Sequence, residues 1–464
     1  MLPRFAWTSE RICDVLGIST EGSDPRVYTG VSTDSRSMRP GELFVGLSGE
    51  NFDGADFVAA AADAGAAGAL VERQPRDVPE GFELFLVRDA LEGLGKLAAA
   101  RRRALSPTVV AITGTSGKTT TRELTTAVLG AAAYGSPGNY NNLVGLPLSI
   151  LQAPEQVGIW VLEVASNQPG EVERLGRVAA PDYAIITSVS EGHLEGFRDL
   201  AGVLQEKLGL VSTLGTDGRA LLADQPAELA GRARATCSNV RTVGLSSEAD
   251  EHPVDWTLSS EGISWKWRGT DFRMPGYGTH LIVDALFAVV TAADLEVEPH
   301  VAAERLAVAK LPAMRGEVRR VGGLKLFVDC YNANPASFAA AIEALSGLAG
   351  KGRRAVLVGT MLELGAKTAG LHEQVAQQII DSGIELVAAT GEFRPAFERL
   401  SSKRDERLIL ASDLELAYQG LATRLRGDEC VLIKASRGMK FERAITWFER
   451  DFGGKRRNIQ EMEG

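Results

Sequence analysis

A glycine-rich turn between a strand and a helix constrains the fold of this chain more than any other feature. The run Gly114-Thr-Ser-Gly-Lys-Thr119 follows the β-branched segment 109–113 and opens a helical pattern that continues through residues 121–129. Glycines let backbone N–H groups turn toward a phosphate, the helix N-terminus favours negative charge, and the lysine adds a cation. The run therefore predicts a nucleotide phosphate site, with the Thr119 hydroxyl directed at Mg²⁺.

The spacing of this run differs from that of the common P-loop. Two residues separate its glycines where the P-loop has four, and Ile112 stands where the first P-loop glycine would be. A standard P-loop kinase or GTPase is therefore disfavoured. The alternative is a purely structural turn with a solvent-facing lysine. The position of the run at a strand end favours phosphate binding instead. The predicted ATP contacts are Gly114, Thr115, Ser116, Gly117, Lys118, Thr119 and Thr120.

The pattern of apolar segments predicts three domains. A chain of 464 residues exceeds one ordinary core. Residues 1–106 combine an alanine-rich helical stretch with short apolar strands, and residues 107–312 alternate buried-type strands with helices. The alternation restarts over residues 313–464. We expect an α/β fold with a small N-terminal α/β domain, a central P-loop doubly wound ATPase domain and a C-terminal Rossmann-like domain.

Composition excludes several classes of protein. A net charge of -10 argues against a nucleic-acid partner, because a phosphate backbone is bound through clustered lysine and arginine. The four cysteines are far apart and lack zinc-site or disulfide spacing, which fits a reducing compartment. No apolar stretch of membrane-spanning length and no signal-like N-terminus occurs. We expect a cytoplasmic protein without membrane insertion and a monomer, although the sequence leaves the oligomeric state open.

Several motifs together resemble those of the Mur ligases, whose phosphate loop has the same shortened form G-x-x-G-K-[ST]. Val31-Ser-Thr-Asp-Ser-Arg36 looks like the uridine-nucleotide-binding domain of that family, although alone it could be a capped turn. Gly138-Asn-Tyr-Asn-Asn-Leu-Val-Gly-Leu-Pro147 is similar to the loop that meets the muramoyl peptide. Asp329-Cys-Tyr-Asn-Ala-Asn-Pro335 looks like the run of the D-alanyl-D-alanine-adding branch, and the D-N-P-R motif of the diaminopimelate-adding or lysine-adding branch does not occur.

The resemblance implies an ATP-dependent, ADP-forming amide ligase of peptidoglycan precursor synthesis. Its substrates would be a UDP-N-acetylmuramoyl tripeptide and D-alanyl-D-alanine, and the third residue of the tripeptide stays open. ATP would convert a carboxylate into an acyl phosphate that the amine attacks, so catalysis would rest on positioning and cations. The family implies that residues 1–106 bind the UDP-muramoyl peptide, 107–312 bind ATP and 313–464 bind the incoming amine.

Four further residues carry the expected chemistry. Glu163 ends an apolar strand, where a carboxylate is costly alone but suited to Mg²⁺, the alternative being a solvated loop carboxylate. The resemblance implies that His193 helps hold a second Mg²⁺, although a lone histidine is more often structural. It also implies that Lys207 is carbamylated; without the resemblance this residue would be an exposed helix lysine. Arg315 could reach the γ-phosphate when the domains close.

The complete set of expected site residues follows from these motifs. Expected catalytic residues are Lys118, Glu163, His193, Lys207 and Arg315, and expected metal ligands are Thr119, Glu163, His193 and Lys207. Further nucleotide contacts are His280, Arg315 and Asp329. Expected substrate contacts are Ser32, Thr33, Asp34, Ser35, Arg36, Asn139, Asn142, Tyr331, Asn332, Asn334, Lys434, Ser436 and Arg437.

The chain departs from the family pattern at several positions. The adenine-contacting run H-N-x-x-N reads His280-Leu-Ile-Val-Asp284, so both asparagines are missing. Ser188 stands where asparagine is usual, Thr360 replaces an aspartate, and residues 165–166 replace a glycine-alanine pair. These substitutions touch binding rather than phosphate chemistry. Two alternatives stay open: a Mur-like ligase with another carboxylate or amine, and a non-catalytic binding protein on the same fold.

Overall fold

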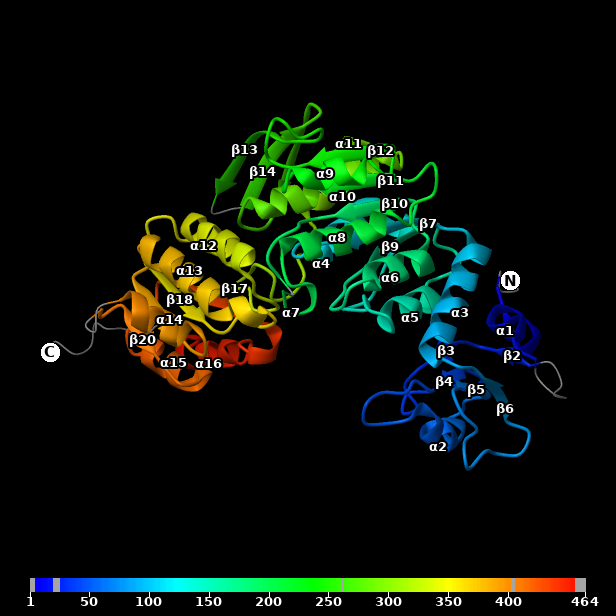
Figure 1. Cartoon of the computed structure of the whole chain (residues 1–464). Coiled ribbons are helices and arrows are strands. Elements are labelled where there is room, and N and C mark those ends of the chain that lie inside the picture. The colour runs from blue at the N-terminus through cyan, green and yellow to red at the C-terminus, as the bar shows by residue number, and fades with distance from the viewer. Residues whose placement is uncertain (1–4, 20–25, 193, 260–261, 402–404, 455–464) are drawn as a thin grey trace.

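The computed structural model describes residues 5–19, 26–192, 194–259, 262–401 and 405–454. Figure 1 shows three lobes in chain order, with the central lobe between the other two. The N-terminal lobe contains a four-stranded parallel sheet in the order β3-β4-β5-β6 and a separate antiparallel pair, β1-β2. Its elements are β1 (Trp7–Thr8), α1 (Ser9–Leu16), β2 (Val27–Tyr28), β3 (Val31–Ser32), β4 (Leu43–Val45), α2 (Val58–Asp63), β5 (Gly68–Val71), β6 (Glu83–Leu86) and α3 (Ala90–Leu105).

Helix α3 leads from this lobe into the central sheet. Asp89 caps its first turn, and Ser106 takes a left-handed conformation directly before Pro107, which ends the helix. The central sheet has the order β12-β11-β10-β7-β9-β8, and every neighbouring pair in it is parallel. Its strands are β7 (Thr108–Thr113), β8 (Ala133–Gly135), β9 (Ile159–Glu163), β10 (Tyr183–Ile186), β11 (Arg219–Ala223) and β12 (Asn239–Val243).

Helices cover both faces of the central sheet, which explains why its inner strands β7, β9, β10 and β11 are mostly apolar. The helices of this lobe are α4 (Lys118–Leu129), α5 (Gly145–Gln152), α6 (Glu171–Ala179), α7 (Leu194–Phe197), α8 (Leu200–Val211), α9 (Glu228–Ala233), α10 (His280–Asp294) and α11 (Pro299–Ala307). A three-stranded antiparallel sheet of β13 (Val254–Ser259), β14 (Gly262–Trp267) and β15 (Thr270–Met274) precedes α10. The alternation of strands with helices that the sequence predicts for residues 107–312 did not include this small sheet.

The C-terminal lobe is a second α/β unit, as the sequence predicts. Its sheet has the order β16-β17-β21-β18-β19-β20, with β16 antiparallel to β17 and the other neighbours parallel. Its strands are β16 (Glu317–Val321), β17 (Leu324–Val328), β18 (Arg354–Val358), β19 (Leu386–Ala389), β20 (Leu408–Leu410) and β21 (Cys430–Lys434). Its helices are α12 (Pro335–Ala349), α13 (Thr368–Asp381), α14 (Phe393–Leu400), α15 (Leu414–Ala422) and α16 (Arg443–Phe452).

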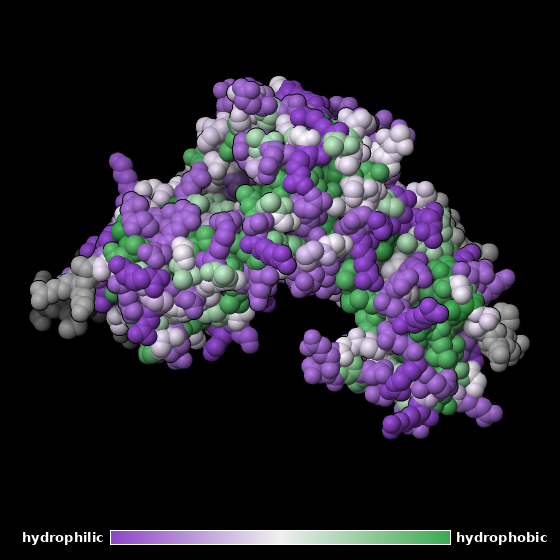
Figure 2. Space-filling model, in the orientation of Figure 1, coloured by the Kyte–Doolittle hydropathy of each residue, from purple (hydrophilic) through white to green (hydrophobic). Residues whose placement is uncertain are grey.

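The three lobes form an arch. Figure 2 shows one face of the molecule hollowed between the N-terminal and C-terminal lobes, with the central lobe as the roof of the hollow. All four cysteines are buried as free thiols. Within the part of the chain that the structure describes, every helix is too short or too polar to span a bilayer. The predicted α/β class with three lobes is therefore confirmed.

Candidate active site

The order of the central strands places a switch point at the end of β7. The chain leaves β7 to form β8 and β9 on one side of it and β10 on the other. In open α/β sheets, ligands bind at the carboxyl ends of the strands where the direction of strand order reverses. The glycine-rich run follows β7, Glu163 is the last residue of β9, and Ser188 follows β10, so three predicted or divergent positions meet at one edge.

Both glycines of the run are required by the backbone. Gly114 has φ +148°, and a Cβ there would lie 2.2 Å from Thr187 Oγ1. Gly117 has φ +86°, and a Cβ there would lie 2.5 Å from a carboxylate oxygen of Asp284. Because a side chain at either position would collide, the loop keeps its backbone close to its neighbours and open toward a ligand.

The end of β10 fixes the loop. Ser116 N donates to Ser188 Oγ at 2.9 Å, and the Ser188 hydroxyl donates to Ser116 O at 3.0 Å. The Thr187 hydroxyl donates to the same carbonyl at 2.5 Å, and Thr115 N donates to Ser188 O at 3.0 Å. Ser188, which departs from the family pattern, thus holds the middle of the phosphate loop.

Lys118 begins α4 and folds back over its own loop. Its ammonium donates to Gly114 O at 2.7 Å and to Thr115 O at 3.2 Å. Loss of solvent lowers the pKa of Lys118 to about 8; Glu163 opposes this shift and Arg315 adds to it. An ammonium held only by carbonyl oxygens gains from the arrival of an anionic phosphate.

Glu163 is the centre of a small oxygen-rich cluster. Its side chain is 2% exposed and accepts hydrogen bonds from the Thr119 hydroxyl at 2.9 Å and from Asn141 Nδ2 at 2.8 Å. A guanidinium nitrogen of Arg122 lies 3.6 Å from the oxygen that Thr119 contacts. A carboxylate beside a hydroxyl suits a hard, oxygen-seeking cation such as Mg²⁺.

The metal set predicted from sequence is only partly brought together. Thr119 and Glu163 touch, whereas His193 lies outside the described residues. Among the described residues, no group of three or more histidine, cysteine, aspartate or glutamate side chains has a metal-binding arrangement. Among the described residues, a metal here would be held by Thr119 and Glu163, and by Lys207 only if that residue is modified.

Lys207 is buried rather than exposed. Its ammonium donates to Ser166 Oγ at 3.2 Å and lies 5.7 Å from the centre of the Phe197 ring. Burial lowers the pKa of Lys207 to about 7, with the charge of Lys118 acting in the same direction and Glu206 and Glu171 opposing the shift. A large fraction of this amine is thus unprotonated near neutral pH, the form that reacts with electrophiles.

The C-terminal lobe contributes cations and a direct contact. The Arg315 guanidinium stacks 3.9 Å from the centre of the Tyr331 ring, and its charge lowers the pKa of both Lys118 and Asp284. Asn334 caps α12 through Ser337 N at 2.8 Å and also donates from Nδ2 to Ser116 Oγ at 3.0 Å. The phosphate loop is therefore in contact with the third lobe.

Of the other predicted substrate contacts of this lobe, two are buried and two are exposed. Lys434 is 1% exposed and pairs with Asp329 at 2.5 Å, and the Ser436 hydroxyl accepts from Leu362 N at 3.0 Å. Asn332 and Arg437 are exposed, and the Arg437 guanidinium lies 3.2 Å from Glu442. Lys434 and Ser436 thus stabilise the loops that carry the exposed residues Asn332 and Arg437.

The altered adenine-contact run places two unusual groups in α10. Among the described residues, the buried Nδ1 of His280 has no hydrogen-bond partner, and burial lowers the pKa of this ring. Asp284 is 5% exposed and accepts from the Thr121 hydroxyl at 3.2 Å. Burial raises the pKa of Asp284 to about 7, against the opposing effects of Thr121 and Arg315.

The predicted uridine motif forms a closed turn in the N-terminal lobe. Asp34 accepts from Arg36 N at 3.0 Å and from the Arg36 guanidinium at 2.8 Å, which lowers the Asp34 pKa to about 2. Ser32 Oγ accepts from Asp34 N at 3.2 Å, and Ser32, Thr33, Asp34 and Ser35 are half-buried. These residues lie in a different lobe from the phosphate loop.

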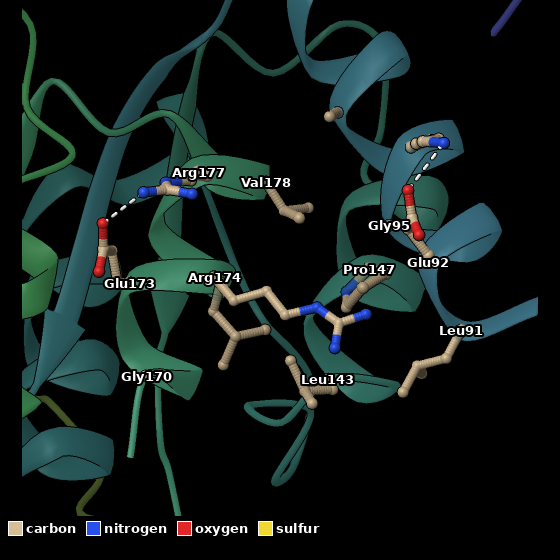
Figure 3. A pocket seen from close by; sticks show the side chains of 13 residues that line it. Leu91, Glu92, Gly95, Leu143, Pro147, Gly170, Glu173, Arg174, Arg177 and Val178 are labelled. Carbon is tan, nitrogen blue, oxygen red and sulfur yellow. Dashed lines mark hydrogen bonds and ion pairs between the residues drawn. The ribbon is translucent and has the colours of Figure 1, made fainter. Parts of the chain in front are cut away.

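A groove opens where the N-terminal and central lobes meet. It has a volume of about 530 Å³ between α3, α5 and α6, with Leu91, Leu143 and Pro147 among its walls. Figure 3 shows the Arg174 side chain extending across it, while Arg177 pairs with Glu173. Leu143 and Pro147 belong to the predicted muramoyl-peptide stretch, in which Asn139 and Asn142 are exposed and Asn142 Oδ1 accepts from Gly145 N at 2.8 Å.

Sequence reasoning missed two side chains around Glu163. Asn141, rather than its neighbours Asn139 and Asn142, reaches the carboxylate, and Arg122 approaches it from α4. The available signal for Arg122 was its position one helical turn after Lys118, where a polar residue would face the same edge of the sheet.

Comparisons with known proteins agree with this arrangement. Three protein-family models match: "Mur ligase family, catalytic domain" over residues 27–102, "Mur ligase middle domain" over 112–292 and "Mur ligase, glutamate ligase domain" over 314–437. The UDP-N-acetylmuramoyl-tripeptide–D-alanyl-D-alanine ligase of Bacillus subtilis is 34% identical over 430 residues, covering 90% of this chain and 93% of that protein. The Escherichia coli enzyme of the same name is 31% identical and covers 94% and 97%.

Solved structures show the same likeness. MurF ligase from Thermotoga maritima in complex with ADP superimposes with a TM-score of 0.81 at 29% identity, covering 91% of this chain and 97% of that one. MurF from Acinetobacter baumannii has a TM-score of 0.87 at 24% identity, covering 97% and 100%. Matching motifs, site and near-complete coverage lead to one conclusion: this chain belongs to the Mur ligase family.

Proposed function

We propose that this protein is an ATP-dependent, ADP-forming ligase that joins D-alanyl-D-alanine to a UDP-N-acetylmuramoyl tripeptide in peptidoglycan precursor synthesis. The similar proteins from B. subtilis and E. coli carry this activity in their names, and a similar structure contains ADP. The observation that carries the proposal is that Lys118 and the Thr119–Glu163 pair lie at one strand edge, with Asn334 of the C-terminal lobe hydrogen-bonded to the same loop.

Amide formation at this site begins with activation of the donor carboxylate. One carboxylate oxygen attacks the γ-phosphorus of ATP, the bond to the β-phosphate oxygen breaks, and ADP leaves with the bridging electron pair. Lys118 and the loop amides would hold the phosphates, and Arg315 would offset charge on the transferred group. Thr119 and Glu163 would hold Mg²⁺, which would neutralise phosphate charge.

The second step joins the amine to the acyl phosphate. The amine of D-alanyl-D-alanine attacks the acyl carbon, the carbon–oxygen bond to phosphate breaks, and inorganic phosphate and one proton leave. The side chains of Tyr331, Asn332 and Arg437 stand on the C-terminal lobe beside Arg315, and we assign the acceptor to them. Lys434 and Ser436 support this surface from within.

The donor fits the opposite side of the site. We assign its UDP group to residues 1–106 and its peptide to the stretch 138–147, which reaches Glu163 through Asn141. The donor is anionic, and among the described residues the Arg174 guanidinium, which lines the groove, has no hydrogen-bond or ion-pair partner. We therefore assign part of the donor to the groove between α3, α5 and α6.

Lys207 is proposed to act as a carbamate. Its unprotonated amine would attack CO₂, forming a nitrogen–carbon bond and releasing one proton, so that a buried cation becomes a carboxylate-like ligand. The buried position, the single hydroxyl partner Ser166 and the lowered pKa support this assignment. Together with His193, it completes the ligand set that the family resemblance implies.

A substrate panel tests the proposed function. Purified enzyme is incubated with ATP, Mg²⁺, UDP-N-acetylmuramoyl tripeptide and a set of amines, and ADP release is followed. ADP release that requires both the tripeptide and D-alanyl-D-alanine supports the assignment. Release that depends on another amine or another carboxylate alone would replace it with the alternative Mur-like ligase, and no release with any pair would favour a non-catalytic protein.

A further inference from the structure

A buried arginine connects three parts of the proposed site. Arg122 lies in the first turns of α4 and is 2% exposed. Its Nη1 donates to Gly138 O at 2.7 Å and lies 3.6 Å from a Glu163 oxygen, while Nη2 contacts the neighbouring Glu123. One guanidinium thus touches the phosphate-loop helix, the residue that ends β9, and the segment 136–144, which we call the donor loop.

The donor loop has a second attachment to the same carboxylate. Asn141 Nδ2 donates to the other Glu163 oxygen at 2.8 Å, and Ala165 N donates to Asn141 O at 2.8 Å. Glu163 N also donates to Ser136 Oγ at 3.2 Å. The loop is therefore tied to Glu163 at three points: directly through Ser136 and Asn141, and through Arg122 at Gly138.

The physics of a buried guanidinium makes this connection stiff. Arginine remains charged and carries five N–H donors in a planar fork, so removing one partner leaves a desolvated donor unsatisfied. Leaving a buried charged group without its partner is strongly unfavourable. A movement of Gly138 away from Nη1 is therefore resisted, and a movement that improves this contact also fixes the guanidinium beside Glu163.

We propose that Arg122 is a positioning residue that couples the donor loop to Glu163, so that binding of the donor and of the magnesium nucleotide reinforce each other. This inference rests on the proposed function, because it takes the donor loop and Glu163 to contact the two substrates. Coupling of this kind is reciprocal: whatever the donor adds to nucleotide affinity, the nucleotide adds to donor affinity.

A purely structural arginine would behave differently. Its loss would lower the melting temperature and reduce both affinities independently, leaving the coupling between them unchanged. The discriminating quantity is therefore the coupling factor, the dissociation constant of the nucleotide without donor divided by that with saturating donor. This factor is an equilibrium measurement that needs no turnover.

Calorimetry of the full-length protein measures this factor. The nucleotide is the non-hydrolysable analogue AMP-PNP with Mg²⁺, and the donor is UDP-N-acetylmuramoyl tripeptide; D-alanyl-D-alanine is left out. Arg305→Met is the matched control, because the Arg305 guanidinium, like that of Arg122, donates to a backbone carbonyl, here that of Val128 at the far end of α4. Arg122→Lys keeps the charge and offers one donor centre in place of a fork.

The wild type should show a coupling factor of at least about tenfold, within the usual range for linked sites. Arg122→Met should bring the factor to within about twofold of unity, Arg122→Lys should fall between, and Arg305→Met should keep the wild-type factor. If Arg122→Met does not fold, the coupling factor of Arg122→Lys, which should be lower than that of the wild type, tests the inference.

Three results would overturn the inference: a wild-type factor near unity, an Arg122→Met or folded Arg122→Lys factor equal to the wild type, or an equal loss in Arg305→Met. Failure of the proposed function looks different, because the wild type would then neither bind the tripeptide nor convert it.

Discussion

Asn334 of the C-terminal lobe and Ser116 of the phosphate loop are joined by a hydrogen bond of 3.0 Å from Nδ2 to Oγ. Residues more than two hundred positions apart thus meet on the glycine-rich loop. The same Asn334 caps α12 through a reciprocal pair of bonds with Ser337. The third lobe therefore contacts the glycine-rich loop through the N-terminus of α12, and in this arrangement the charge of Arg315 lowers the pKa of Lys118.

Replacing Asn334 by serine separates the two roles of this residue. Serine retains the ability to cap α12 but is too short to reach Ser116. The melting temperature should therefore stay close to that of the wild type, while the KM for ATP rises by about fivefold or more, reflecting the loss of one hydrogen bond at a buried contact. Steady-state kinetics and thermal unfolding measure the two effects, and an unchanged KM for ATP would show that the contact is incidental.

Asp284 predicts an unusual dependence of stability on pH. Its pKa is near 3.8 in the unfolded chain and about 7 in the folded protein, so between these values only the folded state keeps the proton. The contribution of this group to the free energy of unfolding therefore falls as pH rises from about 4 to 7 and stays low above that. An asparagine side chain does not titrate, so the Asp284→Asn variant should be the more stable protein at pH 8, by up to about 4 kcal/mol.

Urea unfolding of the wild type and Asp284→Asn at pH 5 and pH 8 tests this sign. The advantage of the variant should be larger at pH 8 than at pH 5. Because every other titrating group is shared, the difference between the two proteins isolates position 284. An advantage that is equal at both pH values, or larger at pH 5, contradicts the assignment of a protonated buried carboxyl.

Arg174 and Arg177 offer a matched pair for the donor groove. Arg174 extends into the groove, and Arg177, one turn away on α6, is already paired with Glu173. Arg174→Gln should raise the KM for the UDP-muramoyl tripeptide by about three- to tenfold, typical of losing one charged contact, and leave the KM for D-alanyl-D-alanine unchanged. Arg177→Gln should change neither. Equal donor KM values in both variants would remove the groove from the donor path.

Carbamylation of Lys207 has a direct spectroscopic test. Protein equilibrated with ¹³C-labelled bicarbonate should give one slowly exchanging carbamate resonance, and Lys207→Ala should lack it. Lys207→Ala should also lower kcat by about a hundredfold or more, as expected when a group that supports transition-state charge is lost. A wild-type spectrum identical to that of the variant would show that the amine stays unmodified.

The sequence predicted those parts of the structure that depend on local pattern. The strand-turn-helix around Lys118 was predictable because β-branched residues, two glycines and a helix start occur in one continuous run. The two α/β lobes followed from the alternation of apolar segments with helical ones. By contrast, the sheet of β13, β14 and β15 was missed: β13 is exposed along most of its length, and the period-two alternation of β14 and β15 covers only five or six residues each, between segments read as one strand-helix alternation.

Contacts between distant segments were beyond the reach of sequence. Asn139, Asn141 and Asn142 are chemically alike, and only the folded chain shows that Asn141 reaches Glu163 while Asn142 accepts from Gly145 N. Lys207 illustrates the same limit, because its burial beside Ser166 depends on the packing of α6 against α8. Pattern locates elements, whereas the choice among similar side chains is made by tertiary packing.

Mass spectrometry of the reaction product, combined with ADP release, tests the central claim most directly. Wild-type protein given ATP, Mg²⁺, UDP-N-acetylmuramoyl tripeptide and D-alanyl-D-alanine should form the UDP-linked pentapeptide with one ADP per amide bond, and Lys118→Ala should form neither. If Lys118→Ala consumes ATP at the wild-type rate, or if the wild type releases ADP without forming the pentapeptide, the ligase site described around Lys118 and Glu163 is wrong.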